Sequence, residues 1–157
     1  MKVTLTLNGR PIEADVEARK SLADFIRERE GLTGTHITCE QGVCGAGTIL
    51  VDGRPVRSCI ALAVTADRRD VRTVEGFDDD PVMAVVRRCF SECHALQCGY
   101  CTPGMLVTAR DIVTRLPNAD RARIRLELSG NLCRCTGYLG IVNAIEKAAS
   151  EIRARRP

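Results

Sequence analysis

The chain has 157 residues, of which 45% are hydrophobic, 27% charged and 3% aromatic, and its formal net charge is +3. This length allows one domain or two small ones. Tryptophan is absent and aromatic residues are scarce, which argues against a protein that binds single-stranded nucleic acid by stacking bases on aromatic side chains.

The amino-terminal segment has the pattern of a β-hairpin. Residues 3–7 alternate between apolar and polar, Asn8-Gly9 is a strong two-residue turn, and residues 11–16 can return beside the first strand. This segment lacks the apolar core of a signal peptide, and no stretch of the sequence reaches the roughly 18 apolar residues of a membrane-spanning helix. We therefore expect a cytoplasmic protein without a membrane span.

The elements that follow complete a small α+β module. Ser21 with Asp24 predicts a capped helix that ends near Gly31. A second hairpin and a last strand should come next: the hairpin over residues 48–51 and 55–59 with its turn at Asp52-Gly53, and the strand over residues 71–74.

The pattern changes to helical spacing after the run from Gly76 to Pro81. That run combines flexible, charged and helix-starting residues, so it predicts a linker between an amino-terminal domain (residues 1–76) and a second domain (residues 81–157). Four helices are expected in the second domain: from residue 82 through Phe90, and over residues 102–116, 121–128 and 139–153.

Four of the nine cysteines form a set with the spacing of metal ligands. Cys98-x2-Cys101 and Cys133-x-Cys135 offer four thiolates from two separate loops, and in a reducing cytosol metal ligation explains them better than disulfides. Such a set suits an iron-sulfur cluster or zinc. The identity of the metal decides the function, because zinc has no redox chemistry and cannot carry electrons.

The Cys-x-Cys pair predicts a turn, since residues two apart on a helix point to nearly opposite sides. Gly130 and Gly137 bracket this turn, and glycines there allow backbone amides to approach the sulfurs, where they help to set a cluster's potential.

A second cysteine set lies in the first domain. Cys39 and Cys44, followed later by Cys59, come close to the plant-ferredoxin pattern Cys-x4-Cys-x2-Cys with a distant fourth cysteine, but the third position is Gly47. Gly42 and Gly45 keep the tight loop that wraps a cluster. The sequence therefore predicts a cluster loop that lacks one ligand.

The cysteine motifs closely resemble those of a known family. Residues 97–104 read Gln-Cys-Gly-Tyr-Cys-Thr-Pro-Gly, and residues 130–138 read Gly-Asn-Leu-Cys-Arg-Cys-Thr-Gly-Tyr. Both resemble the small iron-sulfur subunits of the xanthine dehydrogenase family of molybdenum hydroxylases, and carbon monoxide dehydrogenase small subunits look similar. The resemblance covers almost the full length. It implies an α+β protein, with a ferredoxin-like β-grasp domain followed by an all-α four-helix domain, each holding a [2Fe-2S] cluster.

The resemblance also implies the function and the partners. The chain would be an electron-transfer subunit that works beside a large subunit carrying molybdenum and molybdopterin, and usually beside a medium subunit carrying FAD. The assembly would be a heterotrimer or a dimer of heterotrimers. Electrons would pass from molybdenum through both clusters to FAD, with no catalysis by this chain alone. The substrate is not written in these residues.

Carried over residue by residue, the resemblance assigns the ligands. Cys98, Cys101, Cys133 and Cys135 match the cluster nearest molybdenum, and Gln97 matches the residue that contacts molybdopterin. Cys39, Cys44 and Cys59 match three ligands of the cluster nearer the flavin. The sequence departs from the family at Gly47, the fourth ligand position, and at Leu139-Gly140, where Arg-Pro is often found.

Several alternatives remain open at this stage. A cluster in the first loop needs an exogenous fourth ligand or an oxygen from Thr48 or Ser58, or else the loop is empty. The chain could also be a free-standing electron carrier, or a metal-bearing sensor that binds nucleic acid through a basic second half containing Arg121, Arg123 and Arg125. Four further residues have a plainer interpretation than metal ligation: buried apolar residues at Cys89 and Cys93, and polar side chains at His36 and His94.

Overall fold

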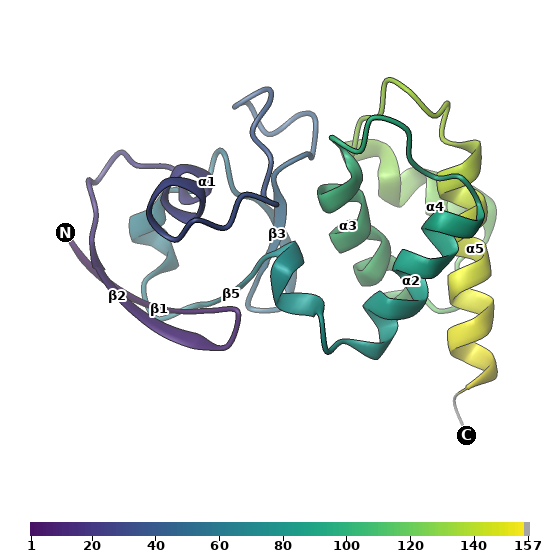
Figure 1. Cartoon of the computed structure of the whole chain (residues 1–157), viewed down its shortest axis with the longest axis horizontal. Helices are drawn as coiled ribbons and strands as arrows, with labels where there is room; N and C mark the ends of the chain where they lie inside the picture. Colours follow the sequence, from purple (N-terminus) through teal and green to yellow (C-terminus); the bar gives the residue numbers. More distant parts are fainter. Residues whose placement is uncertain (156–157) are drawn as a thin grey trace.

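The computed structural model describes residues 1–155, so the last two residues of the expected second domain, 156 and 157, lie outside the described range. A sheet half and a helical half lie side by side along the long axis, with β1 and β2 toward one end of the molecule and α5 toward the other (Figure 1). In residues 1–155, no helix combines the length and the apolar character that crossing a membrane requires.

The amino-terminal half is built on a five-stranded mixed sheet with the strand order β2-β1-β5-β3-β4. Both predicted hairpins are present, and at the first turn Asn8 and Gly9 have the positive φ angles, 51° and 79°, that a two-residue hairpin turn requires. β1 and β5 are parallel. The strands are β1 (Lys2–Leu7), β2 (Arg10–Asp15), β3 (Thr48–Val51), β4 (Arg54–Arg57) and β5 (Asp70–Arg72).

The predicted capped helix packs against this sheet. Ser21 accepts a hydrogen bond from the backbone N–H of Asp24 at 3.0 Å, and the helix starts as α1 (Leu22–Asp24). It then continues with π-helical geometry as η1 (Phe25–Arg29), which the sequence did not predict. Its apolar side chains join those of the strands in one core cluster, so the fold is the expected β-grasp arrangement.

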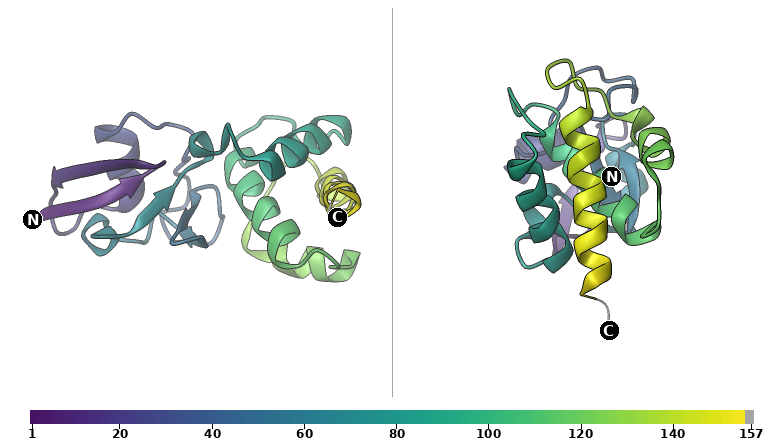
Figure 2. Two further views of the ribbon diagram at one scale, coloured as in Figure 1. Left: turned by 90° about the horizontal axis from the view of Figure 1, so that it is seen from below. Right: turned by 90° about the vertical axis from the view of Figure 1, so that its right-hand side faces the viewer.

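The carboxy-terminal half is helical, and its four predicted α-helices are confirmed. They enclose a second apolar core, with α5 on the side that faces away from the sheet (Figure 2). The α-helices are α2 (Pro81–Glu92), α3 (Thr102–Arg115), α4 (Arg121–Glu127) and α5 (Leu139–Ala154). Three short 3₁₀ turns were not predicted: η2 (Ala63–Ala66), η3 (Val74–Phe77) and η4 (Leu128–Gly130).

The segment predicted as a linker is closely packed. Phe77 is 0% exposed and belongs to the helical core, with the guanidinium of Arg72 4.2 Å and that of Arg110 5.2 Å from its ring centroid. Asp80 accepts a hydrogen bond from the N–H of Met83 at 2.7 Å, which caps α2, and also pairs with Arg110 at 2.7 Å. This segment therefore fixes the two halves to each other; a domain division within it stays a prediction.

Candidate metal centres

The four cysteines of the helical half come together from two loops. One loop precedes α3 and carries Cys98 and Cys101, while the other links η4 to α5 and carries Cys133 and Cys135. The sulfurs meet in cross-loop pairs: Cys98 and Cys135 are 3.5 Å apart, and the thiols of Cys101 and Cys133 lie close enough to shift each other's pKa. The predicted clustering of these four thiols is present in the structure.

The pairwise arrangement bears on the choice of metal. In residues 1–155, the one group of three potential ligand atoms within 4.8 Å of one another is Cys89, Glu92 and Glu151. The four thiols are therefore not gathered around a single point. Bonds of about 2.3 Å to one tetrahedral zinc ion would place all four sulfurs roughly 3.8 Å apart. Two pairs of thiolates fit a two-iron cluster better, because each iron takes two of them.

The Cys133–Cys135 turn is stabilised from its own residues. Tyr138 has a φ of 68°, and its hydroxyl accepts a hydrogen bond from the N–H of Cys133 at 2.8 Å. The hydroxyl of Thr136 donates to Cys133 Sγ at 3.2 Å. Burial opposes ionisation of Cys133, but the hydrogen bonds from Thr136 and from the N–H of Cys135 outweigh it and lower the pKa. The turn is thus prepared to hold a thiolate.

A cavity of about 240 Å³ lies between the two loops. Its volume equals that of several water molecules, at about 30 Å³ each in the liquid, so it can hold a group of several atoms. Burial raises the pKa of Cys101 to about 12, so a metal must displace the proton of that thiol. The cavity is lined by the four cysteines together with Thr38, Cys44, Ala46, Tyr100, Leu132 and Arg134.

The cysteine loop of the sheet half is also assembled. Cys39 Sγ accepts hydrogen bonds from the N–H of Cys44 at 3.4 Å and of Gln41 at 3.5 Å. These bonds, with that of Cys44 the largest contributor, lower the pKa of Cys39 to about 6, so its thiolate is present at neutral pH. Burial raises the pKa of Cys59, and the charges of Cys39 and Cys44 act in the same direction, as expected for sulfurs close together.

Gly47 is buried in this loop, and its surroundings are tight. A Cβ at this position would lie 2.9 Å from the carbonyl oxygen of His36 and 3.0 Å from Ser58 Oγ. The Ser58 hydroxyl donates to the Gly47 carbonyl at 2.7 Å. The Thr48 hydroxyl donates to the Gly45 carbonyl at 2.6 Å and accepts from Arg57 at 2.7 Å. Both candidate oxygen ligands are therefore already engaged in hydrogen bonds.

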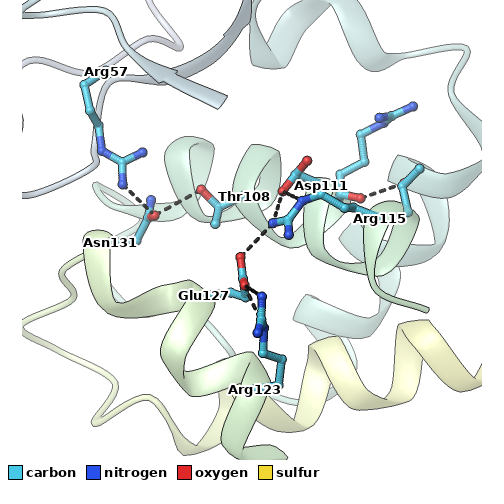
Figure 3. A network of polar contacts seen from close by, with 9 residues as sticks. Arg57, Thr108, Asp111, Arg115, Arg123, Glu127 and Asn131 are labelled. Atoms are coloured by element: carbon cyan, nitrogen blue, oxygen red, sulfur yellow. Dashed lines mark hydrogen bonds and ion pairs between the residues drawn. The ribbon is translucent and has the colours of Figure 1, made fainter. Parts of the chain in front are cut away.

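The two cysteine loops touch each other directly. The N–H of Leu132 donates to the carbonyl oxygen of Cys44 at 2.8 Å, which joins the residue before Cys133 to a candidate ligand of the other set. Asn131 is 2% exposed, and its side-chain NH₂ donates to the Gly45 carbonyl at 3.1 Å. The hydroxyl of Thr108 donates to Asn131 Oδ1 at 3.0 Å (Figure 3).

His36 and Tyr100 form a second contact between the loops, which sequence reasoning missed. Their rings stack with centroids 4.6 Å apart, and His36 Nδ1 lies 2.6 Å from the Tyr100 carbonyl oxygen. The Tyr100 hydroxyl donates to the Ile37 carbonyl at 2.6 Å. The position of Tyr100 inside Cys98-x2-Cys101 was the one available signal, but no local pattern in the sequence links it to His36.

The remaining candidates have different surroundings. Gln97 is exposed beside Cys98, and its side chain makes no hydrogen bond within residues 1–155. Cys89 is fully buried, as interpreted from the sequence, and Cys93 is half-buried against the same core. The group formed by Cys89, Glu92 and Glu151 is a poor candidate for a metal site, because Arg88 and Lys147 already pair with its carboxylates.

Comparisons with known proteins agree with this geometry. Residues 5–75 match a family described as the 2Fe-2S iron-sulfur cluster binding domain, and residues 73–146 match the [2Fe-2S] binding domain family. The caffeine dehydrogenase subunit gamma of Pseudomonas sp. (strain CBB1) is 49% identical over 94% of this chain and 90% of its own length. The nicotine 6-hydroxylase small subunit of Paenarthrobacter nicotinovorans is 44% identical over 97% and 92%.

Solved structures give the same result. A chain of quinoline 2-oxidoreductase from Pseudomonas putida 86 has a TM-score of 0.91 and 48% identity, over 100% of this chain and 98% of that one. This chain belongs to the small iron-sulfur subunits of the molybdenum hydroxylases. Aldehyde oxidoreductase from Desulfovibrio gigas contains the same fold within a longer chain: its TM-score is 0.90 at 32% identity, over all of this chain and 18% of that one.

Membership of this family confirms the predictions of fold, function and cofactor. The iron-sulfur subunit has a β-grasp domain followed by a helical domain, binds [2Fe-2S] and transfers electrons as the non-catalytic part of an oxidoreductase. It works within a complex of several subunits. The interpretation as a nucleic-acid-binding sensor is therefore set aside.

Proposed function

We propose that Cys98, Cys101, Cys133 and Cys135 hold the [2Fe-2S] cluster nearest molybdenum, and that Gln97 contacts the molybdopterin of a large subunit. The two cross-loop sulfur pairs and the cavity between them support this ligand set. Cys98, Cys135 and Gln97 are exposed, so a partner subunit can approach them. Such a cluster supplies one-electron transfer.

We also propose that Cys39, Cys44 and Cys59 hold the cluster nearer the flavin with three thiolates. The lowered pKa of Cys39, its hydrogen bond from the N–H of Cys44, and the effect of the Cys39 and Cys44 charges on the pKa of Cys59 support it. An exogenous ligand then completes the coordination at the Gly47 position, because the hydroxyls of Thr48 and Ser58 are engaged elsewhere. A site with three thiolates should lose iron more readily and have a shifted potential.

The hydrogen bond from the N–H of Leu132 to the Cys44 carbonyl is the observation that carries the proposed electron path between the two sites. Cys44 belongs to one ligand set, and Leu132 directly precedes Cys133 of the other. The chain therefore offers a short path through covalent bonds and one hydrogen bond between its two sets. Electrons would enter at the molybdenum side, cross this contact and leave toward FAD.

We also propose that the chain divides into domains at residues 1–76 and 81–157. The complex would include an FAD-binding medium subunit, form a heterotrimer or a dimer of heterotrimers, and be located in the cytoplasm. Caffeine, nicotine and quinoline, after which three relatives are named, are all N-heterocycles. We propose that the complex containing this chain oxidises an N-heterocycle. A panel of heterocycles and aldehydes offered to the purified complex would test this.

The test of the proposed function is metal analysis and electron spin resonance of the complex purified without air. Two sites predict about four irons and four sulfides per copy of this chain and two distinct signals after reduction. Co-purification with molybdenum and flavin subunits separates a subunit from a free-standing carrier, which would stay alone. Zinc in place of iron, or a protein that is colourless before reduction, would overturn the assignment of the helical site.

A further inference from the structure

Arg57, the last residue of β4, is half-buried and has an unusual set of partners. Its guanidinium donates to Thr48 Oγ1 at 2.7 Å and to the Gly130 carbonyl at 2.7 Å, and Asn131 Oδ1 lies 3.4 Å away (Figure 3). All three acceptors are neutral oxygens. Within residues 1–155, no carboxylate lies within 4.0 Å of this guanidinium.

Most other half-buried arginines have an anion; within residues 1–155 Arg27, like Arg57, donates to neutral oxygens alone, the carbonyls of Thr33 and Thr35. Arg72 and Arg110 share Asp80, and Arg87 pairs with Asp78. A charge removed from water is costly unless an opposite charge or several hydrogen bonds compensate it. Arg57 lies two residues before Cys59, and its partner Thr48 donates to the carbonyl of Gly45, the residue after Cys44. The guanidinium is therefore held at the base of the cysteine loop, whose thiolates can balance its charge.

The position of this guanidinium is fixed from both halves of the molecule. Thr48 holds it from the sheet half, and Gly130 with Asn131 holds it from the helical half. A Cβ at residue 130 would overlap Arg57 Nη2, so a larger residue there would displace the end of this side chain. This differs from the reason expected from the sequence, which was the approach of amides to sulfur.

We infer that Arg57 is the fixed counter-charge of the Cys39, Cys44 and Cys59 site and raises the reduction potential of a cluster bound there. The inference rests on the proposed function. One-electron reduction makes such a site more negative by one charge. A neighbouring cation of fixed position stabilises that reduced state more than the oxidised one, so the potential becomes more positive. Arg57 would thus influence electron transfer through its charge, by raising the reduction potential of this site.

Spectroelectrochemical titration of the purified complex tests the inference with three variants. Arg57→Gln removes the charge and keeps an NH₂ donor, Arg57→Lys keeps the charge and loses the planar fork, and Arg54→Gln removes an exposed charge from the same strand. The signal of the first site is the one that Cys39→Ala abolishes. We expect a more negative midpoint potential in Arg57→Gln, recovery in Arg57→Lys, and the wild-type value in Arg54→Gln.

Every other outcome has a fixed meaning. If Arg57→Gln fails to hold iron at the first site while Arg57→Lys holds it at the wild-type potential, the counter-charge is supported. Equal potentials in wild type, Arg57→Gln and Arg54→Gln overturn it, as does an Arg57→Lys variant that behaves like Arg57→Gln. If the wild-type complex itself lacks the first signal, the three-thiolate site of the proposed function fails and the inference fails with it. Two wild-type signals with no shift overturn the inference alone.

Discussion

Gly47 combines a missing ligand with a tightly packed environment. A cysteine there would supply the fourth thiolate of the ferredoxin pattern, but its Cβ would first press on the carbonyl oxygen of His36 and the hydroxyl of Ser58. Ser58 is held in place by its hydrogen bond to the Gly47 carbonyl. The chemical gain and the steric cost therefore act on the same residue, and two variants can separate them.

Where the three-thiolate site of the wild type loses iron during purification, we expect Gly47→Cys to restore iron and sulfide to about four per chain and to lose iron to a chelator more slowly. Gly47→Ala is the matched control, because it adds the same Cβ without a thiol and should only lower the melting temperature. Iron and sulfide quantification on both variants checks this. Equal iron content in Gly47→Cys and Gly47→Ala would contradict a simple lack of one ligand.

At the scale of elements, Asp80 determines where α2 begins and how it meets β5 and α3. Burial opposes the ionisation of Asp80, but hydrogen bonds from Arg110 and from the N–H of Met83 outweigh it and lower the pKa. A carboxyl whose pKa is lowered on folding contributes stability above its ordinary pKa of about 3.9, and this contribution is lost as the pH falls through the lowered value.

The Asp80→Asn variant removes the negative charge and keeps the helix cap, since asparagine caps a helix about as well as aspartate. We expect the free energy of unfolding at pH 7 to fall by about 2 kcal/mol, the contribution of hydrogen bonds between charged groups. Urea unfolding at several pH values measures it. The difference between wild type and variant should shrink below about pH 4; a difference independent of pH would show that the charge is not its cause.

Most element boundaries were predictable because they depend on neighbours in the sequence. Asn8-Gly9 and Asp52-Gly53 set the hairpin turns, and the spacing of apolar residues gave the four helices. The π-helical turn after Asp24 was not predictable, because it requires one residue more per turn without a sequence signal. The burial of Phe77 was missed because charged neighbours dominate its local pattern.

At the scale of the whole molecule, the two halves meet through loops that are distant in the sequence. The contacts of His36 with Tyr100 and of Arg57 with Gly130 span 64 and 73 residues. Local patterns give the cysteine sets but not their relative position, since that depends on how two separate cores pack. The ligand residues could be named from the sequence; the residues that join the two sites required the structure.

A substitution at Gly104, in the first turn of α3, tests how the two halves are coupled at this junction. A Cβ there would overlap the carbonyl oxygen of Gly45 and lie 2.9 Å from that of Ala46. Alanine alone would favour the helix by about 1 kcal/mol, whereas overpacking costs on the order of 2 kcal/mol. We expect Gly104→Ala to split one calorimetric unfolding transition into two, as the halves lose their coupling.

Gly140→Ala is the control for this change. It also lies in a helix, and its Cβ would meet the Cys93 carbonyl at 2.7 Å, entirely within the helical half. It should lower the melting temperature and leave a single transition. A Gly104→Ala variant that unfolds in one step at the wild-type temperature would show that the junction does not couple the halves.

The cavity between the cysteine loops has consequences for the biogenesis of the subunit. Its walls include Thr38, Cys44 and Ala46 from the first third of the chain, and Cys133 and Cys135 from near its end. During synthesis on the ribosome, the early wall emerges long before the late one. Because the cavity is complete only once both loops have been synthesised, iron and sulfide delivered to it must meet a chain in which the sheet half and the loop before α5 are both present.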